Sequence, residues 1–274
     1  MSWSGSSVSF EKEVAIVHAV LMEEMTWPEI RDAMDAGATT VIIPVGAVEQ
    51  HGPHLALGTD ALMGEIDAVE LARRLGNALV APVIRPGISP HHLSFSGTLS
   101  LRKETLVMVL EDYVASYIRH GFRKMLFFCS HGGNYDAVGE TVERMRKAYP
   151  DCYFYPEPDL LELLGTMNGV GSCDGIGPEA VGAHAGDSEA SQMLAYFPEL
   201  VRMERAKAGF LAPFDSSAKK RLFEGGTRSL SEIGVIGDPR EATAERGKRY
   251  VAATVKLLEK TIRDCDAAAE REKA

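Results

Sequence analysis

The sequence has few cysteines, and their spacing carries no recognisable motif. Cys129, Cys152, Cys173 and Cys265 lie far apart and form no CxxC pair. Neither a disulfide framework nor a cysteine zinc site is indicated, so we expect four reduced thiols. Cys129 ends the apolar run 125–129, and we expect it to be buried packing rather than a nucleophile.

Long apolar runs and an excess of basic charge are also absent. No stretch reaches the roughly 18 consecutive apolar residues of a membrane span, and the polar residues 1–10 lack the basic and hydrophobic regions of an export signal. The net charge is −10, whereas nucleic-acid binding requires clustered Lys and Arg. We therefore expect a cytoplasmic protein with neither a nucleic-acid nor a membrane partner.

The length and composition fit one globular domain. A chain of 274 residues with 45% hydrophobic residues can bury a full core. We predict a single domain over residues 1–274 with its core at about 20–264. Residues 1–10 and 267–274 are expected to be flexible.

Short β-rich segments alternate with longer helical ones, which predicts an α/β domain whose mainly parallel sheet is covered by helices on both faces. The predicted strands are 40–45, 78–84, 124–129 and 152–155, and the predicted helices are 61–75, 103–120, 135–149, 159–167 and 186–197. Residues 169–182 contain five glycines and are expected to form a loop. A last helix is predicted over 239–264, with Asp238 as its N-cap.

The first polar segment follows the predicted strand 40–45. It carries Glu49, His51, His54 and Asp60, and the carboxyl end of a buried strand is where α/β proteins usually place ligands. Carboxylates beside imidazoles suit zinc, manganese or iron. Loop caps and satisfied hydrogen-bond partners are the alternative interpretation of these residues.

A second polar segment, residues 130–134, follows the predicted strand 124–129. Its glycines let the backbone pass close to a ligand and leave His131 accessible, while Asn134 is placed to cap the next helix. A plain strand-to-helix turn is the alternative. Because parallel strands bring their carboxyl ends together, we expect His131 to approach Glu49 and His51.

The third polar segment surrounds a predicted helix start, with His184 before the helix and Glu189 in its first turns. Both side chains can face one site, although Asp187 and Glu189 could instead serve only the helix dipole. The predicted metal ligands are Glu49, His51, Asp60, His131 and Glu189. Asp60 has two oxygens and could bridge two divalent ions, while His184 is left to carry a proton.

These segments, together with residues 234–239 and Ala242-Thr243, closely resemble the creatininase (creatinine amidohydrolase) family over about residues 20–260. The resemblance implies a parallel α/β fold, two zinc or manganese ions per subunit with iron as a further option, and a homohexamer. It implies hydrolysis of non-peptide C–N bonds in small amides. It also implies that the five residues above are metal ligands and that His184 is the catalytic proton carrier.

The sequence departs from true creatininases in two places. They carry His-Tyr-Glu-Asn at the second segment, with that Glu on a metal, whereas Gly133 stands at its place here. We expect Glu189 to replace it as a ligand. True creatininases also close the pocket with central tryptophans, while this chain has only Trp3 and Trp27, near its N-terminus. Creatinine is therefore not the expected substrate.

Other branches of the family deformylate a formylamino-pyrimidine, cleave a peptide in redox-cofactor maturation, or open a cyclic sugar-derived ketone. Residues 90–99 are similar to a pocket-rim segment of the family, so His91 or His92 is predicted to contact substrate, with a solvated surface loop as the alternative. Asn134 of the second segment is also predicted to bind substrate. The expected function is hydrolysis of a small cyclic amide or formamide by a metal-activated water. Hydrolysis of a cyclic sugar-derived ketone or lactone, and a non-catalytic metal-binding homologue, remain as alternatives.

Overall fold

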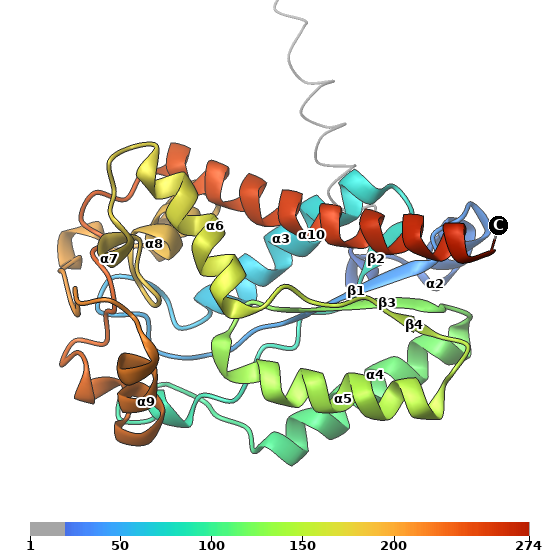
Figure 1. Cartoon of the computed structure of the whole chain (residues 1–274), viewed down its shortest axis with the longest axis horizontal. Helices are drawn as coiled ribbons and strands as arrows, with labels where there is room; N and C mark the ends of the chain where they lie inside the picture. The colour runs from blue at the N-terminus through green and yellow to red at the C-terminus, as the bar shows by residue number, and fades with distance from the viewer. Residues whose placement is uncertain (1–19, 274) are drawn as a thin grey trace, which may run out of the picture.

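A four-stranded parallel sheet forms the centre of the molecule (Figure 1). The computed structural model describes residues 20–273. The strands run in the order β2-β1-β3-β4 and are β1 (Thr40–Val45), β2 (Ala78–Val80), β3 (Lys124–Cys129) and β4 (Tyr153–Phe154). The α-helices are α2 (Trp27–Asp35), α3 (Thr59–Leu75), α4 (Lys103–His120), α5 (Tyr135–Ala148), α6 (Leu160–Ser172), α7 (Pro178–Val181), α8 (Asp187–Tyr196), α9 (Ser216–Gly225) and α10 (Ala244–Lys273).

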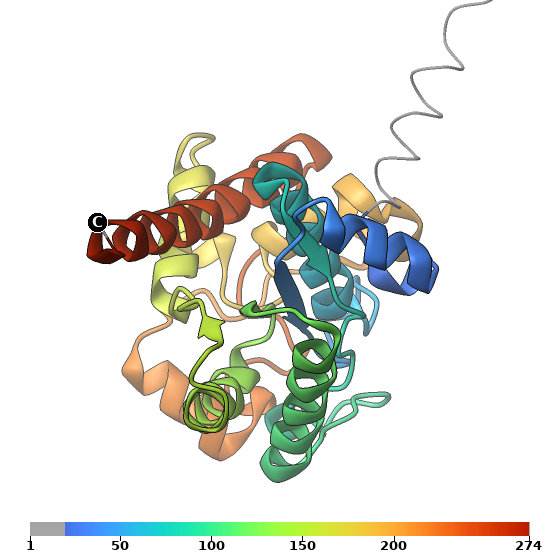
Figure 2. The same cartoon turned by 90° about the vertical axis from the view of Figure 1, so that its right-hand side faces the viewer.

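The two faces of the sheet carry separate cores because side chains alternate along each strand. Val41, Ile43 and Val45 pack with residues of α4 and α5, whereas Ile42 packs with residues of α3 and α10. Figures 1 and 2 show these two helix pairs on opposite faces of the sheet. Every residue of β1 is buried, as expected for a parallel strand covered on both sides. The predicted fold class is confirmed.

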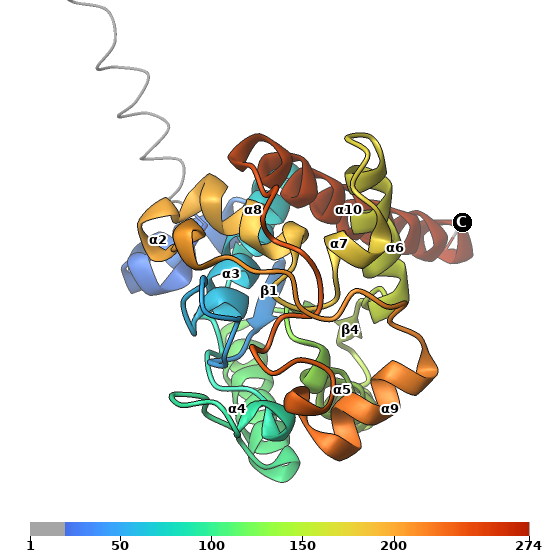
Figure 3. The same ribbon diagram turned by 90° about the vertical axis from the view of Figure 1, so that its left-hand side faces the viewer.

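The sheet register brings the first two polar segments together. Val45 at the end of β1 pairs with Cys129 at the end of β3, so the residues that follow these two strands leave the sheet at the same edge. Gly46 is required there, because a Cβ would lie 2.6 Å from the Cα of Ala61 in α3. Figure 3 shows this end of the molecule, where α7, α8 and α9 and their loops surround the strand ends.

Several predicted boundaries were wrong for local reasons. β2 ends at Val80 rather than residue 84, since Pro82 cannot donate to a strand ladder. α6 continues to Ser172, through part of the predicted loop. α10 starts at Ala244 rather than at Pro239: Asp238 is engaged by Arg240, and the hydroxyl oxygen of Thr243 accepts from the backbone N–H of Arg246 as an N-cap does. The helices α2, α7 and α9 were not predicted, and α7 lies within the predicted loop 169–182.

The predictions for the ends, the cysteines and membrane contact have separate outcomes. Residues 1–10 lie outside the described part, and α10 continues to Lys273 beyond its predicted end. All four cysteines are free, and Cys129 is buried in the core beside α4 and α5. Within residues 20–273, no helix combines the length and apolar character that crossing a membrane demands.

Candidate metal centre

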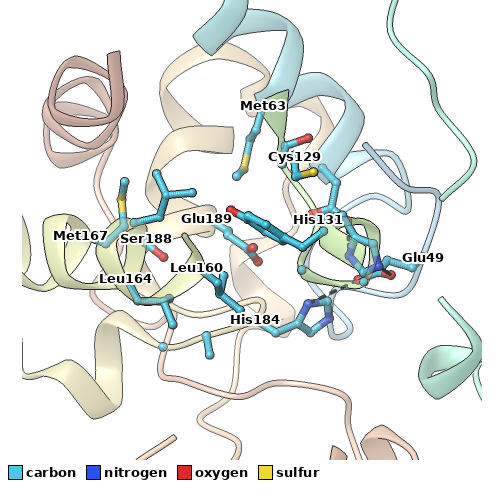
Figure 4. A pocket seen from close by; sticks show the side chains of 18 of the residues that line it. Glu49, Met63, Cys129, His131, Leu160, Leu164, Met167, His184, Ser188 and Glu189 are labelled. Atoms are coloured by element: carbon cyan, nitrogen blue, oxygen red, sulfur yellow. Dashed lines mark ion pairs between the residues drawn. The ribbon is translucent and has the colours of Figure 1, made fainter. Parts of the chain in front are cut away.

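The three polar segments meet in one buried cluster, and all five predicted ligands belong to it. His51 Nε2 lies 3.1 Å from Asp60 Oδ1 and 3.7 Å from Glu189 Oε2. His131 lies 3.4 Å from both carboxylates on its two sides, through Nε2 to Glu49 Oε2 and through Nδ1 to Asp60 Oδ2. Figure 4 shows Glu49, His131, His184 and Glu189 converging on the cavity. The ligands predicted from the sequence therefore lie within reach of one another.

The carboxylates in this cluster lack the hydrogen bonds that burial normally demands. Both oxygens of Glu49 and Oδ2 of Asp60 are buried without a hydrogen-bond partner. An unpaired buried carboxylate is costly, and a bound cation would remove that cost. Asp60 turns one oxygen to His51 and the other to His131, which fits a carboxylate shared by two ions. The donor set of imidazole nitrogens and carboxylate oxygens suits zinc or manganese.

The charges of the cluster shift its protonation equilibria. Burial raises the pKa of Glu49 to about 7, against the opposing effect of His131. Burial by itself would lower the pKa of His51, but the carboxylates of Asp60 and Glu189 raise it to about 10. Without a cation, the cluster therefore retains protons that a metal ion would displace.

Glu189 reaches the cluster from the first turn of α8, next to an unusual backbone conformation at Ala185. Its Oε2 accepts a hydrogen bond of 2.5 Å from the backbone N–H of Ala185. Ala185 is buried and has a φ of 53°, a region that non-glycine residues rarely adopt. This turn places His184 and Glu189 at the same cavity, and such strained backbone is often found at functional sites.

Gly133 leaves no room for the glutamate that true creatininases carry at this place. A Cβ on Gly133 would lie 2.1 Å from the carbonyl oxygen of Ile88 and 2.5 Å from His131 Nε2. Any larger residue would displace this loop or the imidazole. The backbone itself therefore excludes a ligand at position 133, while Glu189 reaches the cluster from α8.

His184 is held with one ring nitrogen bonded to the backbone and the other facing the carboxylates. Its Nε2 lies 2.7 Å from the carbonyl oxygen of Gln50 and 2.9 Å from the side-chain nitrogen of the same residue, and its Nδ1 lies 3.6 Å from Glu49 Oε1. Burial and the neighbouring His51 and His92 lower the pKa of His184 well below its ordinary value. The expectation of an unperturbed pKa near 6.5 was wrong, and the neutral imidazole is the resting form.

Residues 234–237 position His184, which explains why they belong to the sequence pattern. The backbones of His184 and Ile236 pair in an isolated antiparallel bridge. Gly234 packs so tightly on Gln50 that a Cβ would lie 1.8 Å from Gln50 Oε1. Gln50 was missed in the sequence although it stands between Glu49 and His51, because an amide is an uncommon ligand for zinc or manganese and does not titrate.

His91 and His92 line the cavity and are buried, so the alternative of a solvated surface loop was wrong. The Nδ1 of His92 lies 2.8 Å from the side-chain nitrogen of Gln50, and its Nε2 lies 3.2 Å from Glu49 Oε1. The ring of His91 is parallel to that of His131, with centroids 5.8 Å apart, and its Nδ1 has no partner. Thr227 was also missed in the sequence; its hydroxyl donates to the carbonyl oxygen of His91 and lies 2.8 Å from His92 Nδ1.

Asn134 lies beside the cluster with its side chain committed to the backbone. Its Oδ1 accepts from the N–H of Ile88, and its Nδ2 donates to the carbonyl oxygens of Val45 and Gly46. It makes no side-chain cap for α5. Substrate contact by Asn134 stays a prediction, while these three bonds favour a role in joining the end of β1 to the loop before His91.

The cavity beside the cluster is small, and most of its remaining lining is apolar. It measures about 150 Å³. Its apolar lining includes Leu160, Leu163, Leu164, Met167 and Phe223. Trp27 is 80% exposed on α2 and contributes nothing to the cavity, as expected, whereas Trp3 lies outside the described residues.

Known proteins share both the sequence pattern and the fold. The family model described as "Creatininase: Creatinine amidohydrolase" matches residues 23–262. The chain is 35% identical over 238 residues to a "Mycofactocin precursor peptide peptidase" of Mycobacterium ulcerans, covering 84% of this chain and 82% of that protein. It is 26% identical over 266 residues to a "3-dehydro-scyllo-inosose hydrolase" of Thermotoga maritima, covering 89% and 83%.

The fold agrees with solved structures of the same family. A structure named "Creatininase Mn" superposes with a TM-score of 0.73 at 25% identity, over 89% of this chain and 98% of that one. The greater identity to the peptidase than to this creatininase agrees with the departures at Gly133 and at the tryptophans. The chain belongs to the creatininase family, in a branch other than that of the true creatininases.

Proposed function

We propose that this protein is a metal-dependent hydrolase that cleaves an amide C–N bond in a small substrate or at the end of a short peptide. The observation that carries the proposal is the cluster of Glu49, Asp60 and Glu189 with two imidazoles, in which buried carboxylate oxygens lack partners. A neutral His184 at the same cavity adds a group that can move a proton.

The five side chains of the cluster would hold two divalent ions, zinc or manganese, with Asp60 as the shared ligand. Such ions lower the pKa of a water toward neutrality and polarise a carbonyl group. The relative named "Creatininase Mn" supports manganese, and the imidazole nitrogens suit zinc equally. Iron remains a further option for this donor set.

His184 would act first as a base and then as an acid. Both contacts with Gln50 are made by Nε2, so Nδ1 is the ring nitrogen that would accept a proton at the edge of the cavity. The same Nδ1 would then give the proton to the leaving nitrogen. His91, whose Nδ1 has no partner, would bind the substrate.

The relatives and the cavity together support the proposed bond class. The relative from Mycobacterium ulcerans is named a precursor peptide peptidase, which supports a peptide amide in place of the small cyclic amide or formamide first expected. The apolar walls disfavour a polyhydroxylated sugar-derived ketone, the substrate suggested by the name of the Thermotoga maritima relative. A cytoplasmic location, expected from the polar N-terminal residues, and a homohexamer, implied by the family resemblance, are retained as proposals.

The test compares the parent protein with His184→Ala on a panel of formamides, cyclic amides and short peptides, with metal content measured in parallel. Turnover of the best substrate should fall at least about 100-fold, since general acid–base groups contribute on that order. A loss of less than about threefold would remove His184 from the mechanism. Metal content well below one ion per chain after growth with zinc and manganese would contradict the metal-dependent reaction itself and a metal-binding role without catalysis.

A further inference from the structure

The cavity extends past the ligand cluster into a pocket between α3, α8 and α10. We name this the inner chamber, and its residues are Met63, Asp67, Ser188, Gln192 and Thr254. In Figure 4, Ser188 and Met167 lie across the cavity from Glu49. None of the chamber residues is among the proposed metal ligands.

Two polar side chains in the inner chamber have no hydrogen-bond partner. Asp67 is 4% exposed and Thr254 is 2% exposed, yet Asp67 Oδ1 and the hydroxyl of Thr254 are both unpartnered within residues 20–273. Their neighbours are satisfied, because Ser188 donates to the carbonyl oxygen of Val181 and Gln192 donates to that of Ser188. Buried polar atoms are almost always hydrogen-bonded, so these two call for a ligand.

Thr261 shows what the same residue type does when it has no ligand to bind. It lies seven residues after Thr254 on α10, and its hydroxyl donates to the carbonyl oxygen of Leu257. Threonine in a helix commonly makes this bond to its own backbone. Thr254 does not, although it is the more deeply buried of the two.

The chemistry of the inner chamber suits a neutral hydroxyl group. No described basic side chain forms an ion pair with Asp67, and burial followed by the charge of Glu70 raises its pKa well above the ordinary value. An un-ionised carboxyl and a hydroxyl can each donate and accept. An ammonium group would also be repelled by the divalent ions proposed nearby.

The walls of the cavity suit an apolar group of limited size. Met63, Phe128, Leu163 and Met167 line it. The whole cavity, ligand cluster and inner chamber together, measures about 150 Å³, which limits the group it admits to about the size of one benzene ring. Apolar walls with a few polar partners at one end are typical of a site that recognises an amphipathic group.

We infer that the inner chamber is a substrate subsite for a ring-sized apolar group that ends in a hydroxyl, with Asp67 and Thr254 as its hydrogen-bond partners. Its meaning as a substrate subsite rests on the proposed hydrolase function. The binding of such a group does not require turnover, so the two can fail separately.

The test uses phenol and toluene, which differ by one hydroxyl, as probes of the metal-loaded protein. The methyl NMR signals of Met63 and Met167 report occupancy of the cavity, and Met108, which is exposed on α4, is the internal control. Phenol should bind at least as tightly as toluene. The ratio of the two dissociation constants should shift toward toluene by about five- to tenfold in Thr254→Val, the effect of one hydrogen bond.

Asp67→Leu should shift the ratio in the same direction, while Thr261→Val, the matched control on α10, should leave it unchanged. A repeat after metal removal separates the chamber from coordination of phenol to a metal, since binding in the chamber persists. The inference is overturned if phenol leaves the Met63 and Met167 signals unmoved, or if both chamber variants keep the parent ratio within about twofold. If phenol binds as expected but no amide is hydrolysed, only the proposed function fails.

Discussion

Two carboxylates in the first turn of α8 stand two residues apart and have opposite surroundings. Asp187 receives two hydrogen bonds of 2.8 Å from Arg246 and a third of 2.8 Å from the hydroxyl of Tyr250. Glu189 receives only the backbone N–H of Ala185 and otherwise faces His51 and the cavity. The same turn thus carries one carboxylate that is fully paired by the protein and one that is not.

The difference separates a structural role from a functional one. Asp187 joins α8 to α10, and Arg246 also pairs with Asp174 beyond α6. Its pairing is complete, so nothing remains for a ligand to bind. Glu189 belongs to a cluster whose other carboxylates have orphaned oxygens, which is a poor arrangement for stability and a suitable one for binding cations. The alternative interpretation of the sequence, in which Asp187 and Glu189 merely favour the helix dipole, fits neither residue.

The largest expected effect comes from breaking the hydrogen bonds between Asp187 and Arg246. Arg246→Met leaves Asp187 buried without its counter-ion, and we expect a loss of about 3–5 kcal/mol in the free energy of unfolding, measured by urea denaturation. Arg240→Met is the matched control, because Arg240 pairs with Asp238 at the surface and should cost less than about 1 kcal/mol. Equal losses in the two variants would contradict a structural role specific to Asp187 and Arg246.

Removing a carboxylate from the metal cluster should weaken metal binding and cost little stability. Glu49→Gln removes a carboxylate whose oxygens have no partners, so the metal-free protein should lose less than about 1 kcal/mol of stability or gain some. Metal affinity, measured by competition with a chromogenic chelator, should fall at least about 100-fold. Glu232→Gln at the exposed surface should change neither quantity. A large stability loss with unchanged metal affinity would make Glu49 a structural residue.

A smaller effect is expected from pH, because the metal must displace protons from the cluster. The pKa of Glu49 is raised to about 7 and that of His51 to about 10, so both retain protons near neutrality in the metal-free protein. Apparent metal affinity should therefore rise with pH from about 6 to 8, by about tenfold per unit for each proton displaced. The chelator competition repeated across this range measures the slope, and a flat profile would show that the cluster is already deprotonated.

Much of the fold was predictable because its signals are local. The strands at Thr40–Val45 and Lys124–Cys129 and the helix at Lys103–His120 agree with the predicted bounds. Each is a long run of consistent periodicity. The start of α10 was missed because Thr243 supplies the cap and Asp238 bonds to Arg240, a choice between two plausible caps that side-chain contacts decide.

The candidate site was predictable in its ligands and less so in their support. Imidazoles and carboxylates at strand ends can be recognised in a sequence by residue type, and the parallel sheet makes them neighbours. The roles of Gln50, Thr227 and Asp67 cannot be recognised in this way, since amides, hydroxyls and single carboxylates occur throughout any sequence. The pKa of His184 was misjudged for a related reason: its burial and its neighbouring histidines come from distant segments.

The sequence by itself determined the alternation of strands and helices, the residue types of the metal cluster and the loss of a ligand at Gly133. Tertiary structure alone decided that Asp187 would be paired and Glu189 left open, and that Asp67 and Thr254 would meet the same cavity. The physical reason is the distance along the chain over which each effect acts. Periodicity and ligand chemistry act through neighbours in the chain, whereas burial, pairing and the pKa of a buried group depend on which segments the fold brings together.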